Sequence, residues 1–477
     1  MKKVIVYLLC LVMTFSALTV VGSALDISQD VSIWDGTAEE AFNEGTGTEI
    51  DPYIISTAGQ LNYLVNQCMI HSKTYTGEFL KLAADIDWGV NSWTPIGDSV
   101  STSFSGTFDG AGHTIYNLKC TYTYAGVFGC LLNATVKNLA VDYATFSTTT
   151  RYAGAIAAYA KGSNIQNCTV MENVIVKTSD LITSTPQIGG VVGLVAASSV
   201  VDTCVNKGEV LVTTSSGVGF AGGVAGIVGD GGLLKNSINM GKVVTENAVG
   251  AVYTGGVVGG LGSSSKPGTL QNSINTGDVS NKYSYCGGIV GRIHVAASEM
   301  TNSYNFGTVT ANTDMAGLFI GHVNGDVILS TNYSVSFLEV SKCGAVVEGK
   351  NPDLAEMTIL TDSEIFSLDG YTAIITKTNT DIPAFNTVYP SEYVETTVPE
   401  TTVSDTTVND DTTIVETTVK TTGTTSSPTS TTSSTAGADD TSKTTETKTG
   451  CGKSSMMIAF VQLIVVAVGT TVFIKKK

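Results

Sequence analysis

Short apolar runs bounded by glycine recur along the middle of the chain. Each run has the form Gly-Val/Ile-x-Gly or a close variant, and successive runs start 28, 36, 33, 33, 32 and 29 residues apart. The starting glycines are Gly126, Gly154, Gly190, Gly223, Gly256, Gly288 and Gly317. An Asn-Ser-like dipeptide, often closed by Asn-x-Gly, follows each run. This regular period indicates a solenoid, in which each repeat forms one coil and packs on its neighbours.

The pattern inside a repeat predicts three short strands separated by turns. The glycine run is apolar at nearly every position, a second strand surrounds the Asn-Ser position, and a third follows, as at 210–212. An antiparallel sandwich would instead show alternating faces joined by hairpins. A leucine-rich repeat would show a Leu-x-x-Leu-x-Leu pattern, which is missing. We therefore predict an all-β fold, a right-handed parallel β-helix.

A small helix is predicted ahead of the repeats. Thr57 and Gln60 fit a capping box at its start. The apolar side chains that share one face at three- and four-residue spacing are those of Leu61, Leu64, Val65 and Cys68. Short strands separated by Gly and Asp turns follow this helix.

Asparagines recur in two files along the repeats. The first file contains Asn138, Asn167, Asn236, Asn272, Asn302 and Asn332. The second contains Asn206, Asn239, Asn275 and Asn305, each followed two residues later by glycine. Stacked in register, these side-chain amides are expected to hydrogen-bond along the coil axis. The glycines are expected where the backbone bends sharply or takes a positive φ. Both sets are interpreted as structural.

The two ends of the chain carry export and membrane signals. Residues 1–24 have the basic start, apolar run and small residues of a signal peptide. Residues 456–474 are apolar enough for one transmembrane helix, and the lysines at 475–477 are expected to stay in the cytoplasm. The predicted topology is single-pass type I, with the protein on the extracellular face of the cell membrane. Sortase linkage to the cell wall is the alternative, although the Leu and Pro of its usual signal are missing.

The rest of the chain divides into four regions. The predicted regions are an N-terminal cap with the first coils at 25–120, the repeats at 121–335, a C-terminal cap region at 336–393 and a Thr/Ser-rich disordered stalk at 394–455. The stalk has too few apolar residues to fold.

Charge and cysteine usage narrow the range of partners and cofactors. The formal net charge of −17 argues against nucleic acid as a partner, because phosphate binding needs clustered Lys and Arg. No Cys-x-x-Cys pair occurs, and we predict no metal and no cofactor. Cys168 and Cys204 occupy matching places in consecutive repeats. They are interpreted as buried apolar residues, and a disulfide between neighbouring coils is left open.

The repeats resemble the GLUG motif of bacterial surface proteins, as in Gly-Leu-Phe-Ile-Gly at 317–321 and Gly-Val-Val-Gly at 256–259. Upstream phrases such as Phe-Ser-Gly-Thr-Phe-Asp-Gly at 104–110 are similar to the β-helical region that precedes GLUG repeats in immunoglobulin A peptidases. The resemblance covers residues 45–335 and implies a β-helix and a surface location. It does not imply peptidase activity, since the His-Glu-x-x-His pair of those zinc enzymes is absent.

Few residues are candidates for catalysis or for ligand contact. Asp85 and Asp87 are the best carboxylate pair for a polysaccharide lyase or hydrolase, because residues two apart on a strand share a face. Their place in the upstream phrases favours a structural role. Tyr152, Tyr283, Tyr285 and Tyr304 are the candidates for an aromatic strip that contacts a ligand, although packing and cover of the coil edges is the favoured interpretation of these tyrosines.

Together these features predict a Gram-positive cell-surface adhesin or interaction module and not an enzyme. It would bind host or environmental glycans or proteins through one face of the β-helix. A surface polysaccharide lyase or hydrolase, and a purely structural surface spacer, are the alternatives.

Overall fold

The computed structural model describes residues 31–179, 182, 184–213, 217–246, 250–263, 265–294, 297–311, 315–335, 343–346 and 352–360. All of them belong to one of the two compact units of the chain, Met1–Thr397. The predicted signal peptide, stalk and transmembrane helix lie outside the described residues. Among the described residues, no helix has the length and apolar character needed to cross a membrane.

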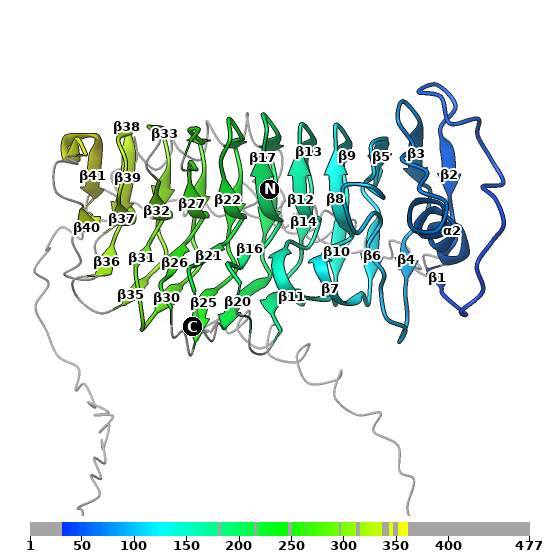
Figure 1. Cartoon of the computed structure of the whole chain (residues 1–477), viewed down its shortest axis with the longest axis horizontal. Helices are drawn as coiled ribbons and strands as arrows, with labels where there is room; N and C mark the ends of the chain where they lie inside the picture. The colour runs from blue at the N-terminus through cyan, green and yellow to red at the C-terminus, as the bar shows by residue number, and fades with distance from the viewer. Residues whose placement is uncertain are drawn as a thin grey trace, which may run out of the picture. The chain divides into compact units, whose positions relative to one another are not determined.

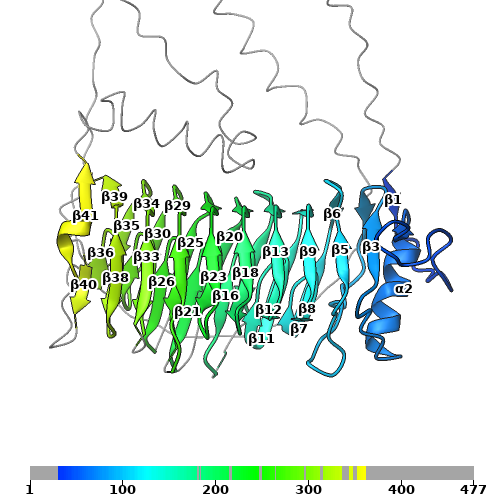
Figure 2. The same ribbon diagram turned by 90° about the horizontal axis from the view of Figure 1, so that it is seen from above.

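The described residues form a parallel β-solenoid of about nine turns with one short α-helix, which confirms the predicted fold class at this level. Four sheets, here named A to D, run along its length. Each coil adds strands that pair in parallel with their equivalents in the next coil. Figures 1 and 2 show these strands side by side along the long axis of the body.

The strands of sheets A and B each follow chain order along the solenoid. Sheet A contains β1 (Ser32–Ile33), β4 (Ile86–Asp87), β6 (Thr114–Tyr116), β10 (Ala140–Asp142), β14 (Thr169–Val170), β19 (Val205–Asn206), β24 (Ile238–Asn239), β29 (Ile274–Asn275), β34 (Tyr304–Asn305), β39 (Asn332–Val335) and β41 (Met357–Leu360). Sheet B contains β2 (Tyr53–Ile55), β3 (Phe79–Leu82), β5 (Thr107–Asp109), β9 (Thr135–Lys137), β13 (Asn164–Gln166), β18 (Val200–Asp202), β23 (Leu233–Lys235), β28 (Thr269–Gln271), β33 (Ser298–Thr301) and β38 (Val327–Ser330).

Sheet C branches at its long strand β11 (Thr145–Ala153), which also pairs with β7 (Lys119–Ala125). One branch contains β15 (Ile175–Thr178), β20 (Glu209–Thr213), β25 (Val243–Glu246), β30 (Val279–Asn281) and β35 (Val309–Ala311). The other contains β16 (Gln187–Gly189), β21 (Gly219–Gly222), β26 (Val252–Gly255), β31 (Cys286–Gly287) and β36 (Ala316–Gly317). Sheet D contains β8 (Phe128–Leu132), β12 (Ala157–Lys161), β17 (Val192–Ala196), β22 (Ala225–Val228), β27 (Val258–Leu261), β32 (Val290–Ile293), β37 (Ile320–Val323) and β40 (Cys343–Val346).

A full coil thus has five strands where the sequence predicted three. In the coil of β21 to β25, the glycine run begins at Gly223, between β21 and β22. The run therefore forms the corner between sheets C and D and does not lie within one strand. Likewise, the dipeptide Asn236-Ser237 is the turn between β23 and β24. The prediction was wrong because short strands on both sides of a corner read as a single apolar run.

Helix α2 (Ala58–Met69) covers the N-terminal end of the solenoid (Figure 2). Its predicted capping box is confirmed, because the Thr57 side chain accepts from the Gln60 N–H and the Gln60 side chain accepts from the Thr57 N–H. The predicted apolar face is buried at Leu61, Leu64 and Val65. At the other end, β40, the short 3-10 helix η2 (Leu354–Glu356) and β41 lie within the predicted cap region 336–393, and both strands extend the solenoid sheets.

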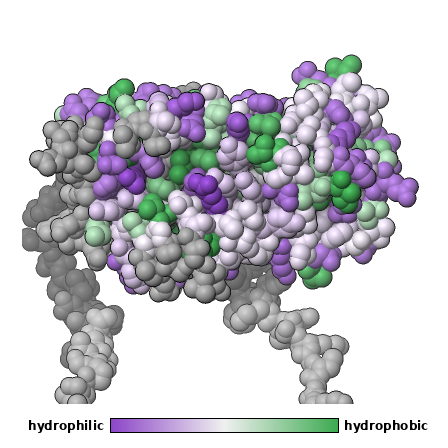
Figure 3. Space-filling model, in the orientation of Figure 1, coloured by the Kyte–Doolittle hydropathy of each residue, from purple (hydrophilic) through white to green (hydrophobic). Residues whose placement is uncertain are grey.

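One apolar core runs through the coils. Its largest fully buried side chains cluster in the N-terminal coils and include those of Trp88, Trp93, Phe104, Phe108, Phe128 and Phe146. Hydrophobic patches on the outside are separated by hydrophilic ones (Figure 3). A second, smaller apolar cluster of Phe220, Ile227 and Tyr253 is separate from this core.

The second asparagine file forms a buried ladder. The Nδ2 atom of Asn206 donates to Asn239 Oδ1 at 2.9 Å, Asn239 donates to Asn275 at 2.8 Å, and Asn275 donates to Asn305 at 2.9 Å. Each Nδ2 also donates to the carbonyl of the glycine two residues later, as from Asn239 to Gly241 at 2.8 Å. All four side chains are fully buried, and these bonds satisfy amides that would otherwise destabilise the interior.

This ladder, and not a positive φ, explains four of the seven leading glycines. A Cβ atom on Gly223 would lie 2.1 Å from Asn239 Cγ and 2.1 Å from the Gly256 carbonyl oxygen. Gly190, Gly256 and Gly288 meet the buried asparagines of their own coils in the same way. None of these glycines is among the described residues with a positive φ. Of the two alternatives expected for these glycines, a sharp bend agrees with their place at the corner, and a positive φ was wrong.

The first asparagine file lies at the turn between sheets B and A. Asn236, Asn272 and Asn302 have φ values of 51°, 47° and 48°. Their side-chain amides form hydrogen bonds between neighbouring coils. Asn272 Nδ2 donates to Asn236 Oδ1 at 3.1 Å, and Asn302 Nδ2 donates to Asn272 Oδ1 at 2.6 Å. Asn332 does not belong to this file. It is fully buried, and its Oδ1 accepts from the Ser303 N–H at 3.0 Å.

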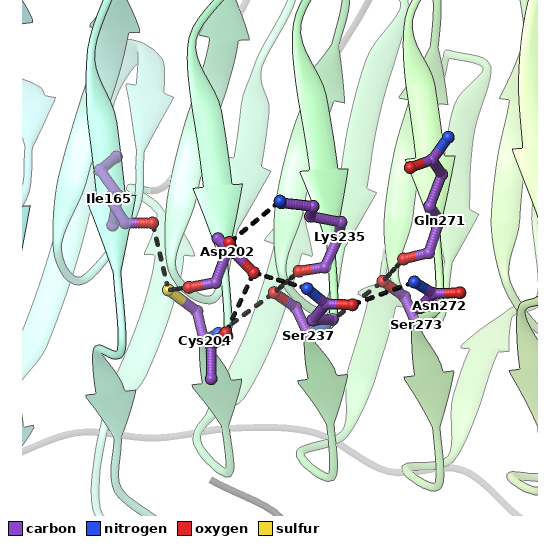
Figure 4. Close-up of polar contacts among 10 residues, drawn as sticks. Ile165, Asp202, Cys204, Lys235, Ser237, Gln271, Asn272 and Ser273 are labelled. Carbon is purple, nitrogen blue, oxygen red and sulfur yellow. Dashed lines mark hydrogen bonds and ion pairs between the residues drawn. The ribbon is translucent and has the colours of Figure 1, made fainter. Parts of the chain in front are cut away.

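Next to this file runs an inner file of serine and cysteine (Figure 4). Ser237 Oγ donates to the Lys235 carbonyl at 2.8 Å and accepts from the Cys204 N–H at 3.1 Å. Cys204 Sγ occupies the place of a serine hydroxyl and donates to the Asp202 carbonyl at 3.4 Å. Cys168 and Cys204 are both fully buried free thiols. Burial raises the pKa of Cys204 well above its usual range, as does the neighbouring Cys168.

Candidate functional site

Two rows of outward-facing side chains follow the corner between sheets C and D. The first row lies on the second branch of sheet C and contains Tyr124, Tyr152, Gln187, Phe220, Tyr253 and Tyr285. The second lies on sheet D and contains Cys130, Tyr159, Leu194, Ile227, Gly260, Arg292 and His322. Parallel, in-register pairing places equivalent positions of successive coils in line. We name these residues, together with His294, the corner rows.

Aromatic rings of the two rows contact each other across the corner. The Tyr253 ring lies 5.5 Å from those of Phe220, Tyr285 and His322 by centroid, and it is stacked on Tyr285 with an interplanar angle of 6°. The rings of Tyr285 and His322 are 4.5 Å apart, and those of Phe220 and His294 are 5.1 Å apart. Stacking along the coils covers the ring faces, so Tyr253 is only 7% exposed.

A second aromatic group lies toward the N-terminal end of the corner rows. The Tyr152 ring is 5.2 Å from Tyr124 and 5.6 Å from Tyr159. The hydroxyls of Tyr152, Tyr253 and Tyr285 hydrogen-bond to no other described residue, and none of these atoms is buried. The corner rows therefore present these hydroxyl groups to solvent.

Both arginines of the repeats stack on these tyrosines. The Arg151 guanidinium lies 5.2 Å from the Tyr152 ring centroid, and that of Arg292 lies 4.6 Å from the Tyr253 ring centroid. Such cation–π contacts orient a guanidinium without neutralising it. Within the described part of the chain, neither arginine forms an ion pair.

Arg292 and the two histidines near it have three buried nitrogen atoms without hydrogen-bond partners. They are Arg292 Nε, His294 Nε2 and His322 Nδ1. Burial lowers the pKa of His294 to about 4, assisted by the charge of Arg292 and by His322. Burial and Arg292 together lower the pKa of His322 to about 4. At neutral pH the arginine therefore carries the positive charge of this group.

Gly260 leaves the space that this group occupies. Added to Gly260, a Cβ atom would lie 2.8 Å from the Phe220 ring and 3.0 Å from His294 Nε2. A larger residue at this place in the second row would displace both rings. The bare backbone of one coil thus lets side chains from its neighbours meet above it.

The four tyrosines predicted from sequence do not form one strip. Tyr152 and Tyr285 belong to the corner rows, near opposite ends of the first row. Tyr283 is 48% exposed and lines a separate hollow of about 320 Å³ with Glu246 and Lys282. Tyr304 is 8% exposed on sheet A, where its hydroxyl donates to Asn302 Oδ1. The structure therefore brings neither Tyr283 nor Tyr304 into line with the other two tyrosines.

Sequence reasoning missed most of the corner rows. The missed residues are Tyr124, Tyr159, Phe220, Tyr253, Arg292, His294 and His322. A signal was present, because Phe220, Tyr253 and Tyr285 each precede the leading glycine of a repeat by three residues. Aligning the repeats on that glycine would have placed these aromatic residues in one file.

Two other features bear on chemistry. A hollow of about 450 Å³ near the branch point of sheet C is lined by Lys119, Ser147 and Lys177 among others. The carboxylates of Asp85 and Asp87 hold the turns of the next coil, since Asp85 Oδ1 accepts from the Thr114 N–H at 3.0 Å and Asp87 Oδ1 accepts from Asn117 at 2.7 Å. No group of three or more His, Cys, Asp or Glu able to hold a metal occurs among the described residues.

The fold and the corner rows define a class, a parallel β-solenoid with an aromatic outer corner. No family model matches the chain. It is 32% identical over 176 residues to halomucin of Haloquadratum walsbyi, a match covering 34% of this chain and 2% of halomucin. It is 31% identical over 142 residues to a candidate Gly-rich membrane protein of Evansella cellulosilytica, covering 28% of this chain and 16% of that protein. The matches thus span a small part of each relative.

Two solved structures are similar in part. A candidate immunoglobulin A1 protease from Bacteroides ovatus has 21% sequence identity and a TM-score of 0.43, with 70% of this chain and 90% of that chain covered. An IgA1 protease has 13% identity and a TM-score of 0.30, with 57% and 23% covered. Both TM-scores are below the level that defines a shared fold. The GLUG resemblance stays a prediction.

Proposed function

We propose that this chain is a bacterial cell-surface adhesin or interaction module that binds glycans along the corner rows of its solenoid. The observation that carries the proposal is the line of tyrosine hydroxyls that hydrogen-bond to no other described residue. Tyrosine suits such a surface, because its apolar ring packs on a sugar while its hydroxyl forms a hydrogen bond. Repeated shallow contacts along a chain of sugars add up by multivalency.

The proposed display arrangement combines the signal peptide, the Thr/Ser-rich stalk and the C-terminal transmembrane helix predicted from sequence, on a right-handed helix of GLUG-like repeats in a Gram-positive bacterium. The names of the two sequence relatives, a mucin-like protein and a membrane protein, support a surface or membrane association. Sortase linkage to the wall remains the alternative mode of attachment.

The test is retention of the purified full-length chain on immobilised mucins, plant glycans and host matrix proteins, with soluble sugar release followed in the same wells. Tyr253→Ala should lower retention about tenfold, equivalent to about 1.4 kcal/mol. Tyr283→Ala is the matched control, since Tyr283 is exposed but lies outside the corner rows. Equal retention of both variants would overturn the proposal.

The same wells separate the alternatives. Release of oligosaccharides would favour a polysaccharide lyase or hydrolase over an adhesin. If neither retention nor release occurs on any surface, the structural spacer becomes the better account.

A further inference from the structure

We propose that the Arg292 end of the corner rows binds the anionic group of an acidic sugar, a carboxylate or a sulfate. This inference rests on the proposed glycan-binding function and names the ligand class. The residues that carry it are Arg292, His294 and His322, with Tyr253 beneath the guanidinium.

The first argument is the state of the arginine. Its guanidinium is held 4.6 Å from the Tyr253 ring centroid and has no carboxylate partner among the described residues. Stacking on a ring leaves the N–H groups at the edge of the guanidinium free. Those N–H groups match the two oxygens of a carboxylate or sulfate, which accept them as a pair.

The second argument is the set of unmade hydrogen bonds. Arg292 and His322 are register partners on β32 and β37, and His294 directly follows β32. Each has a buried nitrogen without a partner. Buried polar atoms are almost always paired, and leaving them unpaired is costly. An oxyanion with several lone pairs would satisfy the arginine and whichever imidazole nitrogens carry a proton.

The third argument is the local charge. The chain has a formal net charge of −17, but residues 187–335 hold six Lys and Arg against eight Asp and Glu, a difference of only −2. Neither of the corner rows contains an acidic residue. Two carboxylates lie beside the rows toward their N-terminal end, since burial and Asp230 raise the pKa of Tyr159, and burial and Asp98 raise that of Cys130. No described acidic residue contributes to the pKa shifts of Tyr253, His294 and His322 around Arg292.

The same pairing of arginine and tyrosine recurs at the other end of the corner rows. Arg151 lies 5.2 Å from the Tyr152 ring centroid and is exposed. Tyr152 and Tyr253 are three coils apart in the first row, about 14 Å at the usual strand spacing of about 4.8 Å. A polymer with repeated acidic sugars would place anionic groups near both arginines at once, whereas a neutral polymer would gain nothing from either.

The experiment compares two polymers of one backbone that differ in charge, and adds heparin as a sulfated polymer. Binding of the full-length chain to polygalacturonate, to its methyl-esterified form and to heparin is measured at low and high salt. We expect the uncharged ester to bind at least tenfold more weakly than polygalacturonate at low salt, with the difference shrinking as salt screens the charge. Equal binding of the free and esterified polymers would overturn the inference without requiring any variant to fold.

Variants then locate the site. Arg292→Gln should lose at least tenfold in binding to polygalacturonate and clearly less in binding to the ester, and Arg292→Lys should be intermediate because it keeps the charge but not the planar fork. Lys282→Gln removes a cation outside the corner rows and serves as the control. Unchanged polygalacturonate binding in a folded Arg292→Gln chain would overturn the assignment.

The remaining outcomes separate this inference from the proposed function. If Tyr253→Ala weakens binding to both polymers but Arg292→Gln weakens neither, the glycan-binding face stands and the anionic site fails. If Tyr253→Ala affects neither polymer, the proposed function itself fails. Equal binding to poly-glutamate would overturn an acidic sugar in favour of an acidic peptide, and preference for heparin would assign the group as sulfate.

Discussion

At the scale of single residues, two files of the repeat depend on each other. In four of the seven glycine runs, a side chain on the leading glycine would collide with the buried asparagine of the same coil, as at Gly223 with Asn239. The asparagine in turn bonds its neighbours in the coils on both sides. Neither the glycine nor the asparagine can be explained without the other. Interpreting glycine as a bend and asparagine as a turn residue therefore missed the close contact between them.

This dependence predicts a specific pattern of stability. Gly223→Ala should lower the free energy of unfolding by about 1–3 kcal/mol, because the added Cβ overpacks against Asn239 and the Gly256 carbonyl. Urea unfolding measures the effect. Gly229→Ala is the control, since its Cβ would meet nothing closer than 3.2 Å.

A double variant identifies the cause. Asn239→Ala removes the side chain that the new Cβ meets, so Gly223→Ala/Asn239→Ala should cost clearly less than the sum of the two single changes. Additive losses would show that the clash is with the backbone alone and that the ladder does not require the glycine.

At the same scale, cysteine and serine are predicted to be interchangeable in the inner file. Cys204→Ser should change stability by less than about 1 kcal/mol, because the new hydroxyl can donate to the Asp202 carbonyl as Ser237 Oγ does to Lys235. Ser237→Ala should cost more, about 1–3 kcal/mol, since it leaves the buried Cys204 N–H without an acceptor. Comparison of their urea midpoints tests both, and a larger loss for Cys204→Ser would contradict the equivalence.

At the scale of strands and sheets, the corner rows contain two histidines, His294 and His322, whose pKa is lowered by folding. His294 and His322 face Phe220, Tyr253, Tyr285, Arg292 and each other, with no carboxylate in these contacts. Their pKa is about 4 in the folded chain against an ordinary value of 6.5. Between these values the unfolded chain binds more protons, so the free energy of unfolding falls as pH drops from about 6.5 to 4.

Thermal melting across this pH range measures the effect. The double variant His294→Gln/His322→Gln should show a shallower loss of melting temperature than the natural chain, while His71→Gln, at an exposed position, should follow the natural chain. Carboxylates also titrate near pH 4. The contribution of the histidines is therefore the difference in melting temperature between the variant and the natural chain at each pH. Parallel curves would show that these histidines bind protons equally in the folded and unfolded states, so that folding does not lower their pKa.

The strands show how far the sequence could predict the fold. The repeat period, the parallel coils and helix α2 all follow from local pattern, because glycine spacing, apolar runs and a capping box are each contained in a short segment. The predicted number of strands per coil was wrong. At Gly223-Val224 the chain turns from sheet C into sheet D, but the residues on both sides of this turn are apolar, so the sequence shows one uninterrupted run. The aromatic file was missed because Phe220, Tyr253 and Tyr285 become neighbours only through pairing across coils.

At the scale of the whole molecule, the register implies that coils are interchangeable units. Gly189 and Gly222 are register partners, so removing residues 190–222 joins Gly189 to Gly223 at an equivalent point of the next coil. Stability in a solenoid is a sum of repeat and nearest-neighbour terms, and one coil fewer leaves all other interfaces in place. The strands β12 and β22 would then pair as β12 and β17 do now.

We expect this deletion chain to fold, with an unchanged β-sheet circular dichroism spectrum and a body about 4.8 Å shorter by small-angle scattering. It keeps Tyr253 and Arg292, so preference for the charged polymer should survive while total glycan retention falls with the shorter row. Deleting residues 190–205 instead leaves a fractional coil and should abolish folding, because strands on either side no longer align. Loss of the β-sheet spectrum in the 190–222 deletion, or its retention in the 190–205 deletion, would mean that stability depends on particular coils and not on the repeat.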